Sequence, residues 1–190
     1  LATAKGLIRA ATGFDDARWR HADGAWRQTT VRDRGDASLF VTETEGDLVV
    51  NAKMTVTKVS RFAEDLRQDF VLVSATSSGA SFSAYGCGIE VVEGAFKTSL
   101  VKLEGEPAYV KTKVLKSVDR AGASSGEDGA VFSVSVNVTG STLTCTVAQG
   151  SEKITIAALD VAASKGTVGF YTRSSAAAFR EARVCRAALR

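Results

Sequence analysis

The sequence predicts an all-β fold in which two antiparallel sheets pack face to face as a sandwich. Three observations favour this fold class. Apolar residues recur at every second position in several segments, the segments are short and separated by turn-forming residues, and helix patterns are few. The length of 190 residues suits one domain. A chain of that size buries about 70 % of its unfolded surface.

The clearest strand signal is a hairpin near residue 140. Residues 132–138 (FSVSVNV) alternate apolar and polar side chains, and residues 143–147 (LTCTV) resume the alternation after Gly140 and Ser141. Two such runs around a short glycine turn are typical of a β-hairpin. One face of this hairpin is expected to be buried, and the other to be solvated and rich in Ser and Thr.

The same alternation extends to other parts of the chain. Residues 48–56 (LVVNAKMTV) alternate over nine positions. Further strands are expected at residues 38–42, 70–75, 81–85, 89–92, 98–103, 109–115, 153–156, 166–172 and 179–186. About eleven short strands indicate an antiparallel sandwich, in which we expect the first strand region to pair beside the last.

Four further segments complete the single domain, residues 1–190. Residues 61–67 and 159–164 are each expected to form a short helical turn. Residues 1–12 are interpreted as an N-terminal extension or an edge strand. Residues 119–129 (DRAGASSGEDG) are expected to be an exposed loop.

Composition excludes several classes of function. The net charge of +3 is too small to make nucleic acid the default partner. No run of 18 apolar residues is present, so no membrane insertion is expected. A single histidine, His21, excludes a multi-histidine zinc site within this chain. Arginines gather near both ends of the chain, and they would form one basic surface if the ends pair in space; the alternative is an ordinary solvated face.

The three cysteines, Cys87, Cys145 and Cys185, are too few and too dispersed for a disulfide framework. Their odd number leaves at least one thiol free or bonded to a partner chain, and buried free thiols are the expectation. No basic-then-apolar leader opens the chain. An extracellular or periplasmic location is favoured.

Four segments carry a resemblance to a known family. They are residues 14–26, with Trp19 and Trp26; residues 46–53 (GDLVVNAK); residues 132–143 (FSVSVNVTGSTL); and residues 166–184, with Gly169, Phe170 and Phe179. In this order they resemble a concanavalin A-like (jelly-roll) domain. Within that group they are similar to the 3-keto-disaccharide hydrolase-type or laminin-G-like family of bacterial sugar-processing proteins. The resemblance spans residues 14–185, except that residues 77–116 depart from the pattern.

No catalytic constellation accompanies the resemblance. Glycoside hydrolysis needs two carboxylates facing one sugar, but Gly46 interrupts the strand that carries Glu43 and Glu45. Glu90 and Glu93 are expected on opposite faces of one strand, each at a solvated edge. His21 is expected in a loop without a nucleophile motif. No catalytic residue and no metal ligand is therefore assigned.

Cofactors are not expected, and any structural calcium ion would use Asp15, Asp16 and Asp160. Aromatic residues that could stack on a sugar ring are the remaining site candidates. Tyr85, Tyr109 and Tyr171 are expected at the surface, where Arg173 would donate hydrogen bonds. Trp19 is the fifth candidate.

The leading hypothesis for function is a non-catalytic carbohydrate-recognition module, as the resemblance implies. One alternative is a structural or assembly subunit that offers its faces to protein neighbours. Another is a divergent glycosidase or lyase acting on a keto-sugar glycoside. The expected partner is a glycan or a protein, within a larger protein or assembly.

Overall fold

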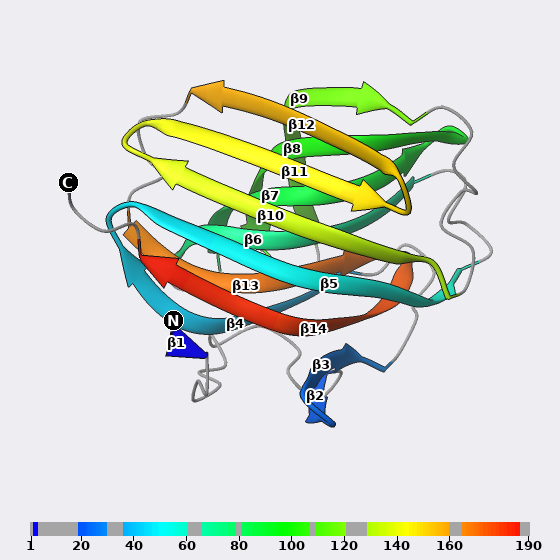
Figure 1. Ribbon diagram of the computed structural model, residues 1–190, viewed down its shortest axis with the longest axis horizontal. Coiled ribbons are helices and arrows are strands. Elements are labelled where there is room, and N and C mark those ends of the chain that lie inside the picture. Colours follow the sequence, from blue (N-terminus) through cyan, green and yellow to red (C-terminus); the bar gives the residue numbers. More distant parts are fainter. Residues whose placement is uncertain are drawn as a thin grey trace.

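The computed structural model describes residues 2–3, 19–29, 36–60, 66–78, 81–106, 109–120, 129–159 and 165–186. Within these ranges every regular element is a β-strand, and the strands form two stacked antiparallel sheets (Figure 1). The all-β sandwich predicted from the alternation is therefore confirmed.

The first sheet has the strand order β12-β11-β10-β5-β14-β3-β2, and β1 also pairs with β14. Its strands are β1 (Ala2–Thr3), β2 (Trp19–Ala22), β3 (Ala25–Gln28), β5 (Leu48–Val59), β10 (Val131–Thr139), β11 (Thr142–Gln149), β12 (Glu152–Leu159) and β14 (Ser175–Arg186). The expected hairpin around Gly140 is β10–β11. The expected pairing of the first strand region beside the last is also present, because Trp26 of β3 is the register partner of Phe179 of β14.

The second sheet has the order β4-β13-β6-β7-β8-β9. Its strands are β4 (Asp36–Glu45), β6 (Leu66–Ser78), β7 (Ser81–Val92), β8 (Ala95–Glu106), β9 (Tyr109–Asp119) and β13 (Lys165–Arg173). The strands expected at 81–85 and 89–92 are one continuous strand, β7. Gly86 and Gly88 do not break it; a Cβ at Gly88 would collide with the carbonyl oxygen of Asp69 on β6, so glycine allows the two strands to approach closely.

Several local predictions need correction. His21 lies in β2 opposite Trp26, not in a loop. The β2–β3 hairpin turns at Asp23 and Gly24, both with positive φ, and an Asp-Gly pair is a typical signal for such a hairpin. Residues 66 and 67 of the expected helical turn begin β6, whereas residues 61–65 lie outside the described part.

The remaining expectations are met only in part. Leu159 of the second expected turn ends β12, and residues 160–164 are outside the described part. In the N-terminal segment, Ala2–Thr3 pairs with β14 as an edge strand, and residues 4–12 are not described. In the expected exposed loop, Asp119 ends β9 and Arg120 is buried; residues 121–128 are not described.

The main core lies between the two sheets and is filled by alternate side chains from both. Phe170 of β13 stacks on Phe179 of β14, with ring centroids 4.4 Å apart. Trp19 packs beside them, 6.3 Å from Phe170 and 6.0 Å from Phe179. These rings join the second sheet to the first, which explains why the closing segment of the chain carries so many apolar residues.

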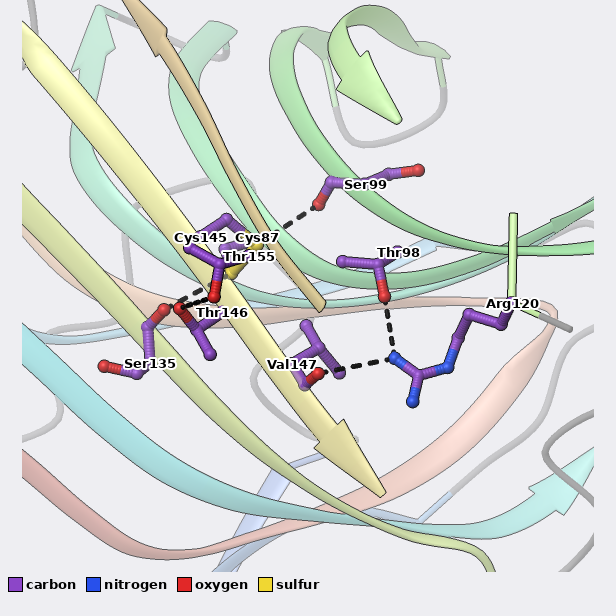
Figure 2. Close-up of a disulfide and its surroundings, with 9 residues drawn as sticks. All are labelled: Cys87, Thr98, Ser99, Arg120, Ser135, Cys145, Thr146, Val147 and Thr155. Atoms are coloured by element: carbon purple, nitrogen blue, oxygen red, sulfur yellow. Dashed lines mark hydrogen bonds between the residues drawn. A yellow bond between two sulfur atoms is a disulfide. The ribbon is translucent and has the colours of Figure 1, made fainter. Parts of the chain in front are cut away.

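A disulfide between Cys87 of β7 and Cys145 of β11 crosses the core and links the two sheets (Figure 2). The expectation that these thiols are free is wrong. The two residues face each other across the sandwich with their Cα atoms 5.4 Å apart, which suits a disulfide. Cys185 is free and partly buried, which is one of the two outcomes that the odd number of cysteines allowed.

Arg120 is buried in the same region of the structure as this disulfide (Figure 2). Its guanidinium donates to Thr98 Oγ1 at 2.8 Å (Figure 2). The guanidinium carbon lies 5.7 Å and 5.9 Å from the ring centroids of Phe96 and Phe132. Glu152 Oε2 lies 2.7 Å from the Arg120 Nη2. Arg120 is an exception to the exposed loop expected at residues 119–129, because its side chain has an ion-pair and aromatic partners that composition does not reveal. Asp119 and Gly129 are exposed, and for residues 121–128 the loop stays a prediction.

Candidate functional site

The outer face of the second sheet carries a row of polar side chains at one end. Register partners on neighbouring strands place Arg173, Gln68, Glu90, Lys97 and Asp119 in line across β13, β6, β7, β8 and β9. They face away from the core because side chains alternate along a strand, and their neighbours Ile89 and Thr172 point inward. Cations, an amide and carboxylates therefore share one face of the sheet.

The middle of this row is a buried hydrogen-bond cluster, which we call the Glu90 cluster: Gln68, Glu90, Ser99 and Thr112. Ser99 Oγ donates to Glu90 Oε1 at 2.6 Å, and Gln68 Nε2 donates to Glu90 Oε2 at 3.2 Å. Both carboxyl oxygens of Glu90 therefore accept a hydrogen bond, and the residue is only 2 % exposed. A buried carboxylate is tolerated where such donors replace water.

Thr112 shows that the sheet curls over this face. Its Oγ1 donates to Gln68 Oε1 at 3.3 Å, although β9 and β6 are separated by β7 and β8 in the sheet. In a flat sheet, strands three places apart would be about 14 Å apart. The outer face is therefore concave, and the start of β9 bends over β6.

Beside the Glu90 cluster, the concave face becomes apolar. A second hydrophobic cluster covers it, made of Phe70, Leu72, Ala75, Phe82, Ala84, Val101, Leu103, Val110 and Tyr171. Tyr171 stacks on Phe70 with ring centroids 6.1 Å apart. Gly86 also faces this side, where an added Cβ would press on Phe70 and Val101. The face thus has a polar end beside a buried cluster of aromatic and aliphatic side chains, each at most 7 % exposed.

The structure brings together two of the five site residues expected from the sequence. Tyr171 and Arg173 lie two positions apart on the concave side of β13; Tyr171 is buried and Arg173 is partly exposed. Tyr85 is wrong as a surface position, since it points into the main core and is 2 % exposed. Trp19 is another core residue, 5 % exposed. Tyr109 begins β9, and its side chain lies outside the described part.

The Glu90 cluster was not predicted from the sequence. Glu90 was expected at a solvated strand edge, whereas the residue lies in a central strand between β6 and β8. A signal was available, since Gln68 and Glu90 are polar residues in or beside apolar runs. Their proximity could not be predicted, because 22 residues separate them and only strand register makes them neighbours.

We expect Ser99→Ala to lower the free energy of unfolding by about 1–3 kcal/mol, because Glu90 Oε1 would lose its closest donor while remaining buried. Urea unfolding followed by tryptophan fluorescence measures the change. Ser117→Ala is the matched control, since Ser117 is the register partner of Ser99 on β9 and is only partly buried. Equal stability of both variants would contradict a supporting role for the Ser99 hydroxyl.

The two buried carboxylates of β6 and β7, Asp69 and Glu90, lie on opposite faces of the sheet. Asp69 points into the core, where Ser175 Oγ donates to it and Arg67 Nε lies 3.2 Å from its Oδ2. Burial raises the pKa of Asp69, and the charge of Arg67 and the bond from Ser175 oppose that rise only in part. A glycosidase holds its two carboxylates on either side of one sugar, about 5 Å or 6.5–9.5 Å apart. The sheet itself separates Asp69 from Glu90.

Among the described residues no group of three His, Cys, Asp or Glu side chains is placed to hold a metal ion. The calcium candidates Asp15, Asp16 and Asp160 lie outside those residues. Within the described ranges no helix is long and apolar enough to cross a membrane.

The architecture matches solved structures over nearly the full chain. A carbohydrate-binding module, CBM66, from Bacillus subtilis is 11 % identical and has a TM-score of 0.59, with 87 % of this chain and 89 % of that chain covered. A legume lectin-like domain from Entamoeba histolytica is 10 % identical with a TM-score of 0.60, covering 89 % and 87 %. A protein of unknown function with a galectin-like fold from Bacillus subtilis is 10 % identical and has a TM-score of 0.62, with 90 % of this chain and 88 % of that chain covered.

These matches define the class of the fold. The chain has the concanavalin A-like jelly-roll fold, as the resemblance of its sequence segments implied. No protein-family model and no curated protein sequence matches the chain. The narrower resemblance to the 3-keto-disaccharide hydrolase-type or laminin-G-like family stays a prediction.

Proposed function

We propose that this protein is a carbohydrate-recognition module. The observation that carries the proposal is the full-length match of its fold to a carbohydrate-binding module and a legume lectin-like domain, each with close to nine-tenths of both chains covered. The polar end of the concave face supports it chemically, since fixed polar groups such as the partly exposed Arg173 suit the hydroxyls of a sugar.

Within that face, Arg173 is proposed as the residue that contacts the glycan. It is partly exposed at the polar end of β13 and offers several donors in a fixed plane. Tyr171 lies two positions before Arg173 on the same face of β13. Gln68 of the Glu90 cluster is the register partner of Arg173 on β6. Arg173 and Tyr171 are the candidates that remain on this face from the sequence analysis.

The module is proposed to be non-catalytic. The position of Asp69 and Glu90 on opposite faces of the sheet supports this, because neither can assist the other across one glycosidic bond. Glu90 is also held by Ser99 and Gln68, as expected of a structural carboxylate. Incubation of the protein with every glycan that it binds should release no new reducing end.

Arg173→Ala should weaken glycan binding by roughly ten-fold or more, because a hydrogen bond from a charged donor contributes about 1.5–3 kcal/mol. A glycan array identifies a ligand, and titration calorimetry then compares the variant with the parent. Lys165→Ala removes the same charge from the exposed start of β13 and should bind like the parent.

Two results would count against the proposal. Absence of binding to any neutral or acidic glycan on a broad array would overturn carbohydrate recognition itself. Equal affinity of Arg173→Ala and Lys165→Ala would leave recognition standing but would place the contact elsewhere.

A further inference from the structure

We propose that the outer face of the first sheet is a separate binding surface for an anionic polysaccharide that bears sulfate or uronate groups. This surface, called here the basic face, consists of Arg20, Arg27, Lys53, Arg180 and Arg183, on β2, β3, β5 and β14. It lies on the opposite side of the sandwich from Arg173. The inference does not depend on the concave face binding a glycan.

Strand pairing brings the two ends of the chain together on this face. β3 pairs with β14, so arginines more than 150 residues apart share one surface. The residues point outward because Trp26, Met54 and Phe179, which alternate with them, fill the core. Four of the terminal arginines, Arg20, Arg27, Arg180 and Arg183, thus share one surface with Lys53, in line with one of the two alternatives left open by the sequence, whereas Arg173 lies on the other sheet.

The basic face contains two like-charged pairs directly opposite each other on neighbouring strands. Arg20 is the register partner of Arg27, and Arg180 is the register partner of Lys53. Like charges in such positions destabilise a sheet. Two such unfavourable pairs side by side cost stability, and proteins keep unfavourable local features of this kind chiefly at functional sites.

A β-bulge in β14 enlarges the basic face. Arg180 pairs with Lys53 and Arg183 pairs with Asn51, so three steps along β14 match two steps along β5. Without the extra residue, side-chain alternation would put Arg180 and Arg183 on opposite faces. Glu181, within the bulge, has a φ of 50°, which is uncommon for a residue with a side chain. The bulge thus aims both arginines outward.

Carboxylates neutralise only part of this charge. Asp23 lies 3.3 Å from Arg27 and Glu181 lies 2.8 Å from Lys53. The hydrogen bond from Lys53, then the charges of Lys53 and Arg183, lower the pKa of Glu181, so it is ionised at neutral pH. Among the described residues, five cations against these two anions leave an excess of three on this face, as large as the net charge of the entire chain.

The chemistry of the surroundings favours a polysaccharide over other polyanions. Arginine binds planar carboxylates and tetrahedral sulfates through two parallel hydrogen bonds. Next to the arginines, Asn51, Ser135, Thr146 and Thr155 form one cross-strand row that can bond hydroxyls. Single-stranded nucleic acid would need aromatic rings for base stacking, and among the described residues this face presents none.

The test compares two double variants that remove equal charge from different faces. Arg180→Ser with Arg183→Ser removes two charges from the basic face. Lys111→Ser with Lys113→Ser removes two charges from exposed positions on β9 of the second sheet. Heparin is the probe, with neutral dextran and a DNA duplex for comparison, and titration calorimetry at two salt concentrations is the readout. The unfolding midpoint of each variant checks that it is folded.

The arginine variant should bind heparin at least ten-fold more weakly than the parent, with an unchanged or higher unfolding midpoint because a like-charged pair is relieved. The lysine variant and Arg173→Ala should bind heparin within two-fold of the parent, which separates this surface from the concave face. Affinity should fall as salt rises. Equal loss in both double variants, no heparin binding by the parent, or equally tight binding of DNA would overturn the inference.

Discussion

Reduction of the Cys87–Cys145 disulfide should lower the free energy of unfolding by about 4 kcal/mol. The bond closes a loop of 58 residues, and cross-linking removes chain entropy from the unfolded state: loops of about 15 and 100 residues give about 3 and 4.7 kcal/mol. Urea unfolding with and without a reductant, and of Cys87→Ala with Cys145→Ala, measures the loss.

Cys185→Ser is the control for this prediction, because Cys185 is unbonded and sits near the exposed end of β14. It should unfold like the parent in the absence of reductant. An unchanged midpoint for the double alanine variant would contradict the assigned pairing. Disulfides persist in oxidising compartments, and the extracellular or periplasmic location stays a prediction.

Arg67→Met should destabilise the protein by about 3–5 kcal/mol at pH 7, because it leaves the carboxylate of Asp69 buried without its cation. Both side chains are almost fully buried, at 2 % and 0 % exposure. Chemical unfolding at pH 7 measures the loss. Lys97→Met is the matched control; it breaks a pair in which Asp119 is 80 % exposed, and it should cost less than about 1 kcal/mol.

The effect of Arg67→Met should also depend on pH. The pKa of Asp69 is raised in the folded protein above its unfolded value of 3.8, mainly by burial. The unfolded state therefore loses this proton first, and the contribution of Asp69 to stability, complete below pH 3.8, is lost as pH rises through the folded pKa. Without Arg67 the folded pKa rises further, so the variant should approach the parent in stability near pH 4 and fall furthest behind it at pH 7. A deficit that is equal at both pH values would contradict this.

Local pattern predicted most of the strands because alternation is a property of consecutive residues. Residues 132–138 and 143–147 show it plainly, and they form β10 and β11. Prediction failed at Gly86 and Gly88, where the glycines suggested a break between two strands but the structure has one continuous strand, β7. It also failed for the β2–β3 hairpin, whose strands of four residues are too short to show a period.

The site residues divide along the same line. Tyr85 and Tyr171 looked alike in the sequence, since each is an aromatic residue in an apolar strand. Tyr85 points into the main core and Tyr171 lies on the concave face, and which side of its strand each occupies depends on sheet stacking. Glu90 was assigned to an edge because nothing in its immediate sequence shows that β7 is a central strand.

The sequence alone therefore determined the fold class, most strand positions and the alternation of buried and outward side chains, since these depend on neighbours along the chain. Tertiary structure decided which strands lie side by side. The Cys87–Cys145 bond, the Glu90 cluster and the opposition of Arg180 to Lys53 all join residues that are distant in sequence. Such contacts arise from strand order, register and bulges, and these are set by the packing of the whole sandwich rather than by any local segment.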